Sequence, residues 1–533
     1  MTRIRSAPAG AGNAAAPREA APGNGKVSGA GRIGRAIWLA GTITLFFLGI
    51  QAWLAFHWMV EWFGTVSFET IIVHMNLPLN AADNRYSESL IIHSILGLLA
   101  AVLFGLFLRR CLRVHSAPRT RTAIVRALVS LFAAMVLCSS LWAWESHYKI
   151  GANFFPDMRY YSYIEDNFHA PDPKAAVFPK EKMNLVLLIL ESVEKTMNDP
   201  AVFLPPLMPR LGRLERENLS FSGYRGAVGT GASILSFYST ILGVPFLSSS
   251  RGLYRLDPVD GELKLRLANW LEKPQLRRHD FRNSSLPGIL ERHGYRLEVV
   301  RAASIRFANY DRLLDMATDH CGVYDFDYFR TIRPDHRERT NNWGVDDGYL
   351  YARARENLAA LQETGQPFVQ IIQTVNTHSP GYYEKDMPRR FGDFRDAFEQ
   401  CDAMAHDFVA WILEQPFAPR TTVIILGDHN LLSTLLGPVE LPPVRKREIV
   451  NIFINAKAGI PARGTQRVFA AWDLAPTILE ALGVRLADRR FGLGVSLFAD
   501  QDTLLEKDGL ERCEEMLLKR SKLYEMSYVW WEE

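Results

Sequence analysis

The chain is 533 residues long, carries a formal net charge of +3 and is 48% hydrophobic. A chain of that length is too long to fold around a single hydrophobic core, so two or more structural units are expected. The small, interspersed charge argues against binding of nucleic acid, and we expect no such partner. The five cysteines form no CxxC pair, which argues against a zinc ribbon or a thiol redox motif.

The first 35 residues are rich in Ala, Gly, Pro and Arg and lack hydrophobic periodicity. This composition predicts a disordered cytoplasmic tail over residues 1–35. A cleaved signal peptide fits poorly, because the apolar run that follows is long enough to cross a bilayer.

Three apolar windows follow, at residues 36–56, 89–108 and 127–144. Each is close to the roughly 20 residues that span a bilayer as a helix, so residues 36–144 are predicted to form a three-helix transmembrane region. Buried helices of a soluble protein are the alternative. The loop charges favour the membrane: arginines gather before the first window and between the second and third. By the positive-inside rule, the N-terminus is cytoplasmic and everything after the third window faces the periplasm or the cell exterior.

Residues 145–183 are mixed and aromatic, with four prolines, and are predicted to be a juxtamembrane connector. Over residues 184–500, short apolar runs alternate with amphipathic helical patterns. The predicted strands are 184–190, 297–301, 368–374, 421–426 and 449–455, and the predicted helices are 206–217, 231–242, 346–362, 393–414 and 473–482. This alternation predicts an α/β domain with a mostly parallel sheet and helices on both faces. Residues 501–533 are predicted to be a C-terminal tail, packed on the domain or touching the membrane surface.

Two of the predicted strands end in residues that commonly bind metals. Glu191 follows the first apolar run, and Asp428 and His429 follow the run that ends at Leu426. In open α/β sheets, ligands bind at the carboxyl ends of the strands. Carboxylate and imidazole groups suit zinc or manganese better than calcium. Either strand end alone is ordinary; together they predict a site for a divalent cation.

A third stretch supplies a candidate nucleophile. Gly229 and Gly231 flank Thr230, and an apolar helical pattern follows. This places Thr230 at a helix N-terminus, where exposed amides and the helix dipole favour an anion. A hydroxyl held there by a metal can ionise and attack phosphorus. The alternative is that Thr230 only caps the helix. Ser233 is the second candidate for the nucleophile.

A fourth stretch places a histidine beyond a strand. His378 follows the predicted strand 368–374, in the sequence Asn376-Thr377-His378. It could stabilise or protonate a leaving group. An incidental loop histidine is the alternative.

The order of these motifs resembles that of the alkaline phosphatase/sulfatase superfamily. The segments that carry the resemblance are Leu190-Glu191-Ser192, Gly229-Thr230-Gly231, Asn376-Thr377-His378, Gly427-Asp428-His429, and the stretches 343–347 and 472–479. More narrowly, the chain is similar to the membrane-anchored branch that contains lipoteichoic acid synthase, phosphoglycerol transferase I and the phosphoethanolamine transferases. The sulfatase motif Cys/Ser-x-Pro-x-Arg does not begin at Cys321, Cys401 or Cys513.

The resemblance implies roles for individual residues. Glu191, Thr230, Asp428 and His429 match a site for one divalent ion (Mn, Zn or Mg), with Thr230 also matching the nucleophile. His378 matches a catalytic and substrate-side histidine. Arg306 lies where the family often places groups that bind phosphate.

The resemblance also implies an activity. The chain would be a membrane-anchored phosphoglycerol transferase, multi-pass in the bacterial inner membrane, with its catalytic domain facing the periplasm or exterior. It would move phosphoglycerol from an anionic phospholipid such as phosphatidylglycerol, through a phospho-threonine intermediate, to a periplasmic or cell-envelope glycan. The alternatives are a phosphoethanolamine transferase, a metal-dependent phosphodiesterase or sulfatase-type hydrolase, and a catalytically silent membrane scaffold.

Overall fold

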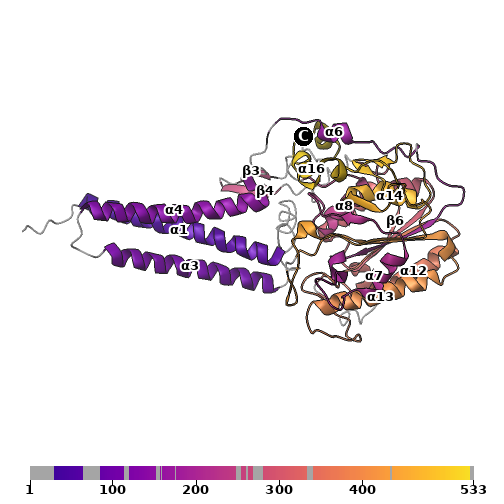
Figure 1. Ribbon diagram of the computed structural model, residues 1–533, viewed down its shortest axis with the longest axis horizontal. Helices are drawn as coiled ribbons and strands as arrows, with labels where there is room; N and C mark the ends of the chain where they lie inside the picture. Colours follow the sequence, from indigo (N-terminus) through magenta and orange to yellow (C-terminus); the bar gives the residue numbers. More distant parts are fainter. Residues whose placement is uncertain are drawn as a thin grey trace, which may run out of the picture.

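The computed structural model shows a bundle of long helices beside an α/β domain (Figure 1). The residues it describes are 29–63, 84–112, 119–151, 157, 159–174, 176–247, 254–259, 262–267, 280–332, 340–341, 343–432 and 435–528. Most of the predicted N-terminal tail lies outside these residues. So do residues 64–83 and 529–533.

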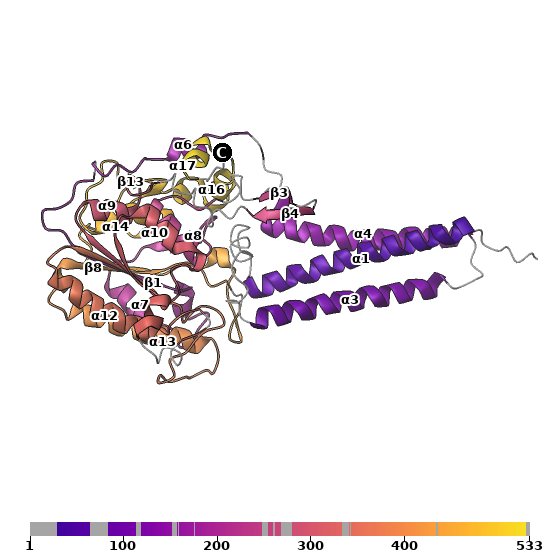
Figure 2. The same cartoon turned by 180° about the vertical axis from the view of Figure 1, so that it is seen from behind.

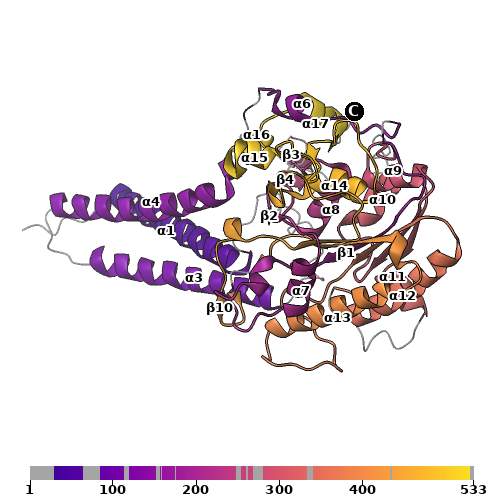
Figure 3. The ribbon, with the colours of Figure 1, turned by 45° about the vertical axis from the view of Figure 1, so that its right-hand side comes forward.

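The long helices are α1 (Gly29–Phe63), α3 (Asn84–Leu112) and α4 (Arg119–Tyr148). They lie side by side at one end of the molecule (Figure 3). All three are long and apolar enough to cross a membrane, over Ile33–Glu61, Glu88–Arg110 and Thr120–Tyr148. Their outward side chains are large and apolar, as lipid contact requires. This confirms the three predicted apolar helices.

Polar groups join the helices of the bundle. The Ser140 hydroxyl donates to the carbonyl of Gly49 over 2.7 Å. The indole N–H of Trp144 donates to the carbonyl of Ala52 over 2.8 Å. Such interhelical hydrogen bonds remove polar groups from the apolar surroundings and hold α4 against α1.

The centre of the other unit is a six-stranded sheet with the order β11-β8-β1-β7-β5-β6. The strands are β1 (Asn184–Leu190), β5 (Arg296–Arg301), β6 (Cys321–Tyr324), β7 (Phe368–Gln373), β8 (Thr421–Gly427) and β11 (Asn451–Ile454). Neighbours are parallel except β11, which runs antiparallel to β8 at the edge. The predicted α/β class and mostly parallel sheet are confirmed. β6 was missed because it is a short, half-exposed edge strand without an apolar run.

Helices cover both faces of this sheet (Figure 2). One face carries α8 (Ser233–Leu242), α9 (Leu286–Arg292), α10 (Tyr310–Ala317) and α14 (Leu474–Ala481). The other carries α7 (Pro209–Glu217), α11 (Phe326–Ile332), α12 (Asp347–Glu363) and α13 (Arg395–Leu413). Alternate residues of β1 enter the two cores: Leu187 packs with the first set and Leu188 with the second. Burial on both faces explains why β1 is apolar without a break.

Small two-stranded sheets lie outside the main one. They comprise β2 (Ser222–Tyr224) with β12 (Gln466–Phe469), β3 (Tyr254–Val259) with β4 (Glu262–Leu267), β9 (Leu435–Leu436) with β10 (Val439–Glu440), and β13 (Arg490–Phe491) with β14 (Gly494–Val495).

The C-terminal residues belong to the folded domain. They form α15 (Leu504–Asp508), α16 (Leu510–Leu517) and α17 (Lys522–Ser527). Tyr524 is buried, and its hydroxyl donates to the carbonyl of Pro245 and accepts the N–H of Leu247. The connector packs on the same segment through α6 (Tyr163–Asn167), where Ser521 donates to Glu165. Of the two predicted positions for the tail, packing on the domain is therefore the one found up to residue 528.

Candidate active site

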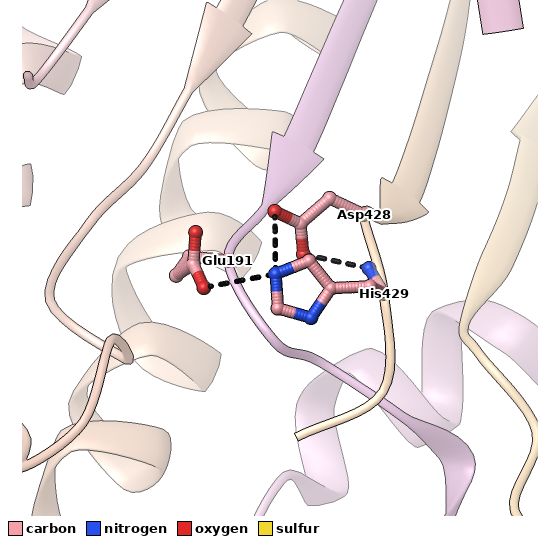
Figure 4. Close-up of side chains that lie close together, drawn as sticks. All are labelled: Glu191, Asp428 and His429. Carbon is pink, nitrogen blue, oxygen red and sulfur yellow. Dashed lines mark hydrogen bonds and ion pairs between the residues drawn. The ribbon is translucent and has the colours of Figure 1, made fainter. Parts of the chain in front are cut away.

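Glu191, Asp428 and His429 come together at the carboxyl ends of two neighbouring strands (Figure 4). Leu190 of β1 pairs with Gly427 of β8, so the residues that follow leave the sheet side by side. All three side chains are buried, and one ligand atom from each lies within 4.8 Å of the others. The Nε2 atom of His429 is 3.5 Å from Oε1 of Glu191 and 3.6 Å from Oδ2 of Asp428.

The buried groups fit a divalent cation. The Oδ1 atom of Asp428 accepts the backbone N–H groups of Ser192 and His429, each at 2.8 Å. Its Oδ2 atom is buried and has no hydrogen-bond partner in the described part of the chain. Burial, together with the charge of Glu191, raises the pKa of Asp428 above its usual range. Two buried carboxylates this close are unfavourable unless a cation compensates them.

The orientation of His429 points to the same role. Its Nδ1 atom is 2.8 Å from the carbonyl oxygen of Asn430. Because a carbonyl only accepts, Nδ1 carries a proton, and Nε2, the nitrogen nearest the two carboxylates, is the one that could bind a cation between them. A backbone carbonyl that fixes the tautomer in this way is typical of metal-binding histidines.

Two hydroxyls contact this cluster: the buried Ser192 hydroxyl donates to Oε1 of Glu191 over 2.8 Å, and the other belongs to Ser233, the first residue of α8. Ser233 is the more exposed of the two. It donates to Oε2 of Glu191 over 2.9 Å and lies 3.4 Å from Nε2 of His429. Its side chain is partly exposed, so a substrate can reach it. The helix N-terminus behind it favours negative charge at the same point.

No hydrogen bond joins Thr230 to the three ligands within the described part of the chain, and its predicted roles as metal ligand and nucleophile stay predictions. Its hydroxyl donates to the carbonyl of Ala227 over 2.9 Å and accepts the N–H of the same residue over 3.0 Å. It is also 2% exposed, so it is shielded from substrate. The physical reason is the tight turn at Gly229, whose φ is 74°. The helix begins only at Ser233, two residues later than predicted, and Thr230 therefore faces back into the turn.

His378 lies in the loop after β7. Its ring packs on that of Trp343, with the centroids 4.0 Å apart. Burial lowers the pKa of His378 to about 4, so the imidazole is neutral at pH 7. The Nδ1 atom is 3.0 Å from the carbonyl oxygen of Ser379 and therefore carries the proton. The Nε2 atom is left as an acceptor of protons or hydrogen bonds.

Two contacts fix this loop beside the cluster. Thr377 donates to the carbonyl of Glu191. The buried carboxylate of Asp347 accepts the backbone N–H groups of Val375 and Asn376, at 2.8 and 3.2 Å. The loop that carries His378 is thus tied directly to the strand end that carries Glu191.

A sequence model of the sulfatase family matches residues 183–484, which is more than half of the chain. The chain belongs to the sulfatase family. This agrees with the predicted resemblance to the alkaline phosphatase/sulfatase superfamily.

The similarity to individual proteins is low in sequence identity and covers only part of each chain. Phosphoglycerol transferase I from Salmonella paratyphi B (strain ATCC BAA-1250 / SPB7) is 28% identical over 356 residues, an alignment that covers 63% of this chain and 43% of that protein. The chain therefore spans less than half the length of the curated relatives it matches. Among solved structures, a protein of the alkaline phosphatase superfamily from Vibrio parahaemolyticus is 18% identical, with 65% and 76% of the two chains covered and a TM-score of 0.48. The lipoteichoic acid synthase LtaP from Listeria monocytogenes is 18% identical, with 63% and 80% covered and a TM-score of 0.45.

Two arginines lie at or just after the carboxyl end of β5, and they differ in burial. Arg306 has an exposed side chain, and in the described part of the chain no contact joins it to the cluster; its role stays a prediction. Arg301, the last residue of β5, is 4% exposed, and the charges of Glu191 and Asp428 act on it. The sequence held a signal for Arg301, because it too is a polar residue at the carboxyl end of a predicted strand.

Proposed function

We propose that this sulfatase-family chain is a metal-dependent phosphotransferase of the bacterial inner membrane. In this proposal it moves phosphoglycerol from a phosphatidylglycerol-like lipid to a hydroxyl of a periplasmic or cell-envelope glycan. The observation that carries the proposal is the Ser233 hydroxyl, which lies on the buried cluster of Glu191, Asp428 and His429 and at the N-terminus of α8. A nucleophile, candidate metal ligands and a helix dipole at one point suit attack on a phosphoryl group.

Glu191, Asp428 and His429 would hold one divalent ion, and the fit of Mn²⁺, Zn²⁺ or Mg²⁺ rests on their carboxylate and imidazole groups. When bound, such an ion supplies Lewis-acid stabilisation of negative charge and lowers the pKa of a neighbouring hydroxyl. Ser233 replaces Thr230 as the nucleophile in the proposal, because its hydroxyl contacts Glu191 and is partly exposed, whereas the Ser192 hydroxyl at the same carboxylate is buried.

In the first step Ser233 Oγ forms a bond to phosphorus, and the bond from phosphorus to the diacylglycerol oxygen breaks. The Ser233 proton passes along its existing hydrogen bond to Glu191 Oε2. The diacylglycerol oxygen takes a proton from solvent, and phosphoglyceryl-serine remains. The first backbone N–H groups of α8 and the helix dipole favour the negative phosphoryl group beside Ser233.

In the second step an acceptor hydroxyl attacks the same phosphorus atom. Its proton passes to Nε2 of His378, which is neutral and carries no proton there, and from there to solvent. Ser233 Oγ leaves and takes back the proton from Glu191. His378 thus serves in this proposal as a base for the acceptor; the sequence suggested that it could stabilise or protonate a leaving group.

The membrane position supports a lipid donor. Three helices are long and apolar enough to anchor the domain in a bilayer, and the arginine-rich segments before the first and between the second and third support a periplasmic or outer position for it. A headgroup of the outer leaflet would then lie within reach of the domain.

The test uses the full-length chain in vesicles that contain phosphatidylglycerol labelled in its headgroup. Wild type is expected to release diacylglycerol and to label an added glucan, and Ser233→Ala is expected to do neither. Label in free glycerol phosphate, with or without glucan, would instead indicate a hydrolase. Transfer only from phosphatidylethanolamine would indicate a phosphoethanolamine transferase. Undiminished diacylglycerol release by Ser233→Ala would overturn the proposal.

A further inference from the structure

Arg301 is a buried arginine that forms no ion pair within the described part of the chain. Its Nη1 atom donates to the carbonyls of Ser304 and Phe307, at 2.8 and 3.4 Å. Its Nε atom is buried without a hydrogen-bond partner. Within the described part of the chain no carboxylate lies close enough to form an ion pair with it. A buried guanidinium without a directly paired carboxylate is unfavourable, so its position favours an anion that binds there.

The other buried arginines differ in this respect. Arg447 is 4% exposed and forms an ion pair with Glu194 at 2.8 Å. Arg467 is 1% exposed and forms an ion pair with Glu506 at 2.8 Å. Where arginine serves only the fold in this domain, a carboxylate neutralises it. Arg301 departs from that pattern.

Its place in the sheet puts Arg301 at the end that carries the cluster. It pairs with Gln373 of β7, which pairs with Ile189 of β1, two residues before Glu191. Burial lowers the pKa of Arg301, and among the charges that raise it are those of Glu191 and Asp428. The guanidinium therefore lies within electrostatic reach of the candidate metal ligands.

A stack of side chains links Arg301 to the helix of the nucleophile. The guanidinium carbon lies 3.7 Å from the centroid of the Tyr310 ring. Tyr310 stacks on Phe237, with centroids 5.2 Å apart, and its hydroxyl accepts a hydrogen bond from Gln373. Phe237 lies one turn after Ser233 on the same face of α8. The stack thus holds Arg301 on the Ser233 side of the sheet.

We propose that Arg301 binds the two non-bridging oxygens of the phosphodiester that Ser233 attacks, and so acts as a catalytic residue. This inference rests on the proposed function. Only Nη1 is used by the protein, which leaves the edge formed by Nε and Nη2. That edge matches two oxygens of one phosphoryl group, the bidentate geometry that lysine cannot reproduce. Tyr310 is a positioning residue, because it supports the plane of the guanidinium.

A purely structural role for Arg301 makes a different prediction. By holding the carbonyls of Ser304 and Phe307, it could serve only to shape the loop before α10. Its loss would then lower the melting midpoint and leave anion binding unchanged. Binding of inorganic phosphate separates the two roles without any need for catalysis.

The experiment uses the purified full-length chain in detergent with Mn²⁺ present. The shift of the melting midpoint is measured against rising inorganic phosphate for wild type, Arg301→Gln, Arg301→Lys and Arg296→Gln. Arg296 is the matched control, because it begins the same strand at the opposite end and is exposed. Arg301→Gln should need about 10- to 100-fold more phosphate for the same shift, the range expected for lost hydrogen bonds to a charged group. Arg301→Lys should be intermediate and Arg296→Gln unchanged.

A second arm measures transfer from phosphatidylglycerol vesicles and separates a lipid headgroup from free phosphate. Arg301→Gln should lower kcat/KM for the lipid by a similar factor. A wild-type phosphate response in Arg301→Gln overturns the inference, even if its midpoint without phosphate is lower. If Arg301→Gln does not fold, a wild-type response in Arg301→Lys overturns it. If wild type transfers nothing but Arg301→Gln still loses the phosphate response, the proposed function fails and the phosphate site stands.

Discussion

The Ser233 hydroxyl donates a hydrogen bond to the Glu191 carboxylate over 2.9 Å, across 42 residues of sequence. One group begins a helix and the other follows a strand, so only the packing of α8 on β1 brings them together. The hydroxyl proton therefore already has an acceptor. A serine in this position meets the geometric requirement for an activated nucleophile.

Variants of the two hydroxyls should have opposite effects. Ser233→Ala is expected to lower transfer by at least about 10³-fold, because it removes the attacking atom. It should leave the melting midpoint nearly unchanged. Thr230→Val is expected to keep transfer within about tenfold but to cost about 1 kcal/mol of stability, since the turn to Ala227 loses its hydrogen bonds. Activity and melting of both variants, measured side by side, test this pairing. A Thr230→Val enzyme as inactive as Ser233→Ala would contradict it.

Asp428→Asn should separate metal binding from folding. The backbone N–H groups that Asp428 accepts can still be accepted by the amide oxygen, and one of two buried carboxylate charges is removed. Without metal, the variant should melt at or above the wild-type temperature. With Mn²⁺, wild type should gain about 2.7 kcal/mol at a hundred times Kd, and the variant much less. Melting scans with chelator and with Mn²⁺, Zn²⁺ or Mg²⁺ provide the measurement. If none of the three metals raises the melting midpoint of the wild type, the proposed metal site is contradicted.

His378 should make stability depend on pH in a defined window. Its pKa is lowered to about 4 in the folded chain and is near 6.5 when unfolded. Between these values the unfolded state binds more protons, so stability rises with pH from about 4 to 6.5. The His378→Gln variant has no imidazole at this position and therefore lacks this dependence of stability on pH. The wild type should therefore lose stability relative to His378→Gln as the pH falls through that window. If the melting midpoints of the two proteins change equally with pH across this window, the lowered pKa of His378 is disproved.

Asp347 should control the loop of His378. Its two oxygens accept the N–H groups of Val375 and Asn376 while fully buried. Asp347→Ala is expected to cost about 1–3 kcal/mol for each N–H left without an acceptor, and to slow transfer by loosening the loop. Asp347→Asn keeps one acceptor and should fall between wild type and Asp347→Ala. Melting midpoints and kcat of the three proteins give the comparison, and equal values for Ala and Asn would argue against the role.

The strand ends were predictable, but the position of the Ser233 hydroxyl at the cluster was not. Glu191, Asp428 and His429 follow nearly continuous apolar runs, and parallel strands must bring such ends to one edge. The choice between Thr230 and Ser233 depends on where the turn at Gly229 ends and α8 begins. That point is set by packing, and sequence patterns locate helix ends poorly. Arg301 was missed because a charge at a strand end is usually solvated, and its burial depends on Tyr310, nine residues later.

The same limit applies to the C-terminal segment. Its charged and aromatic sequence suits either a tail or a packed element, and only contacts with distant residues decide between them. Tyr524 contacts Pro245 and Leu247, which lie more than 270 residues earlier. No local sequence pattern in either segment predicts these contacts.

The central claim is that Ser233 becomes covalently bonded to the transferred group. The most direct measurement is the mass of the peptide that contains Thr230 and Ser233, after the full-length protein is incubated with phosphatidylglycerol and Mn²⁺ without glycan and quenched in acid. Fragmentation should place one phosphoglycerol on Ser233, and the adduct should disappear when glycan is added before the quench. An adduct on Thr230, or an unmodified peptide from a protein that still releases diacylglycerol, would contradict the account.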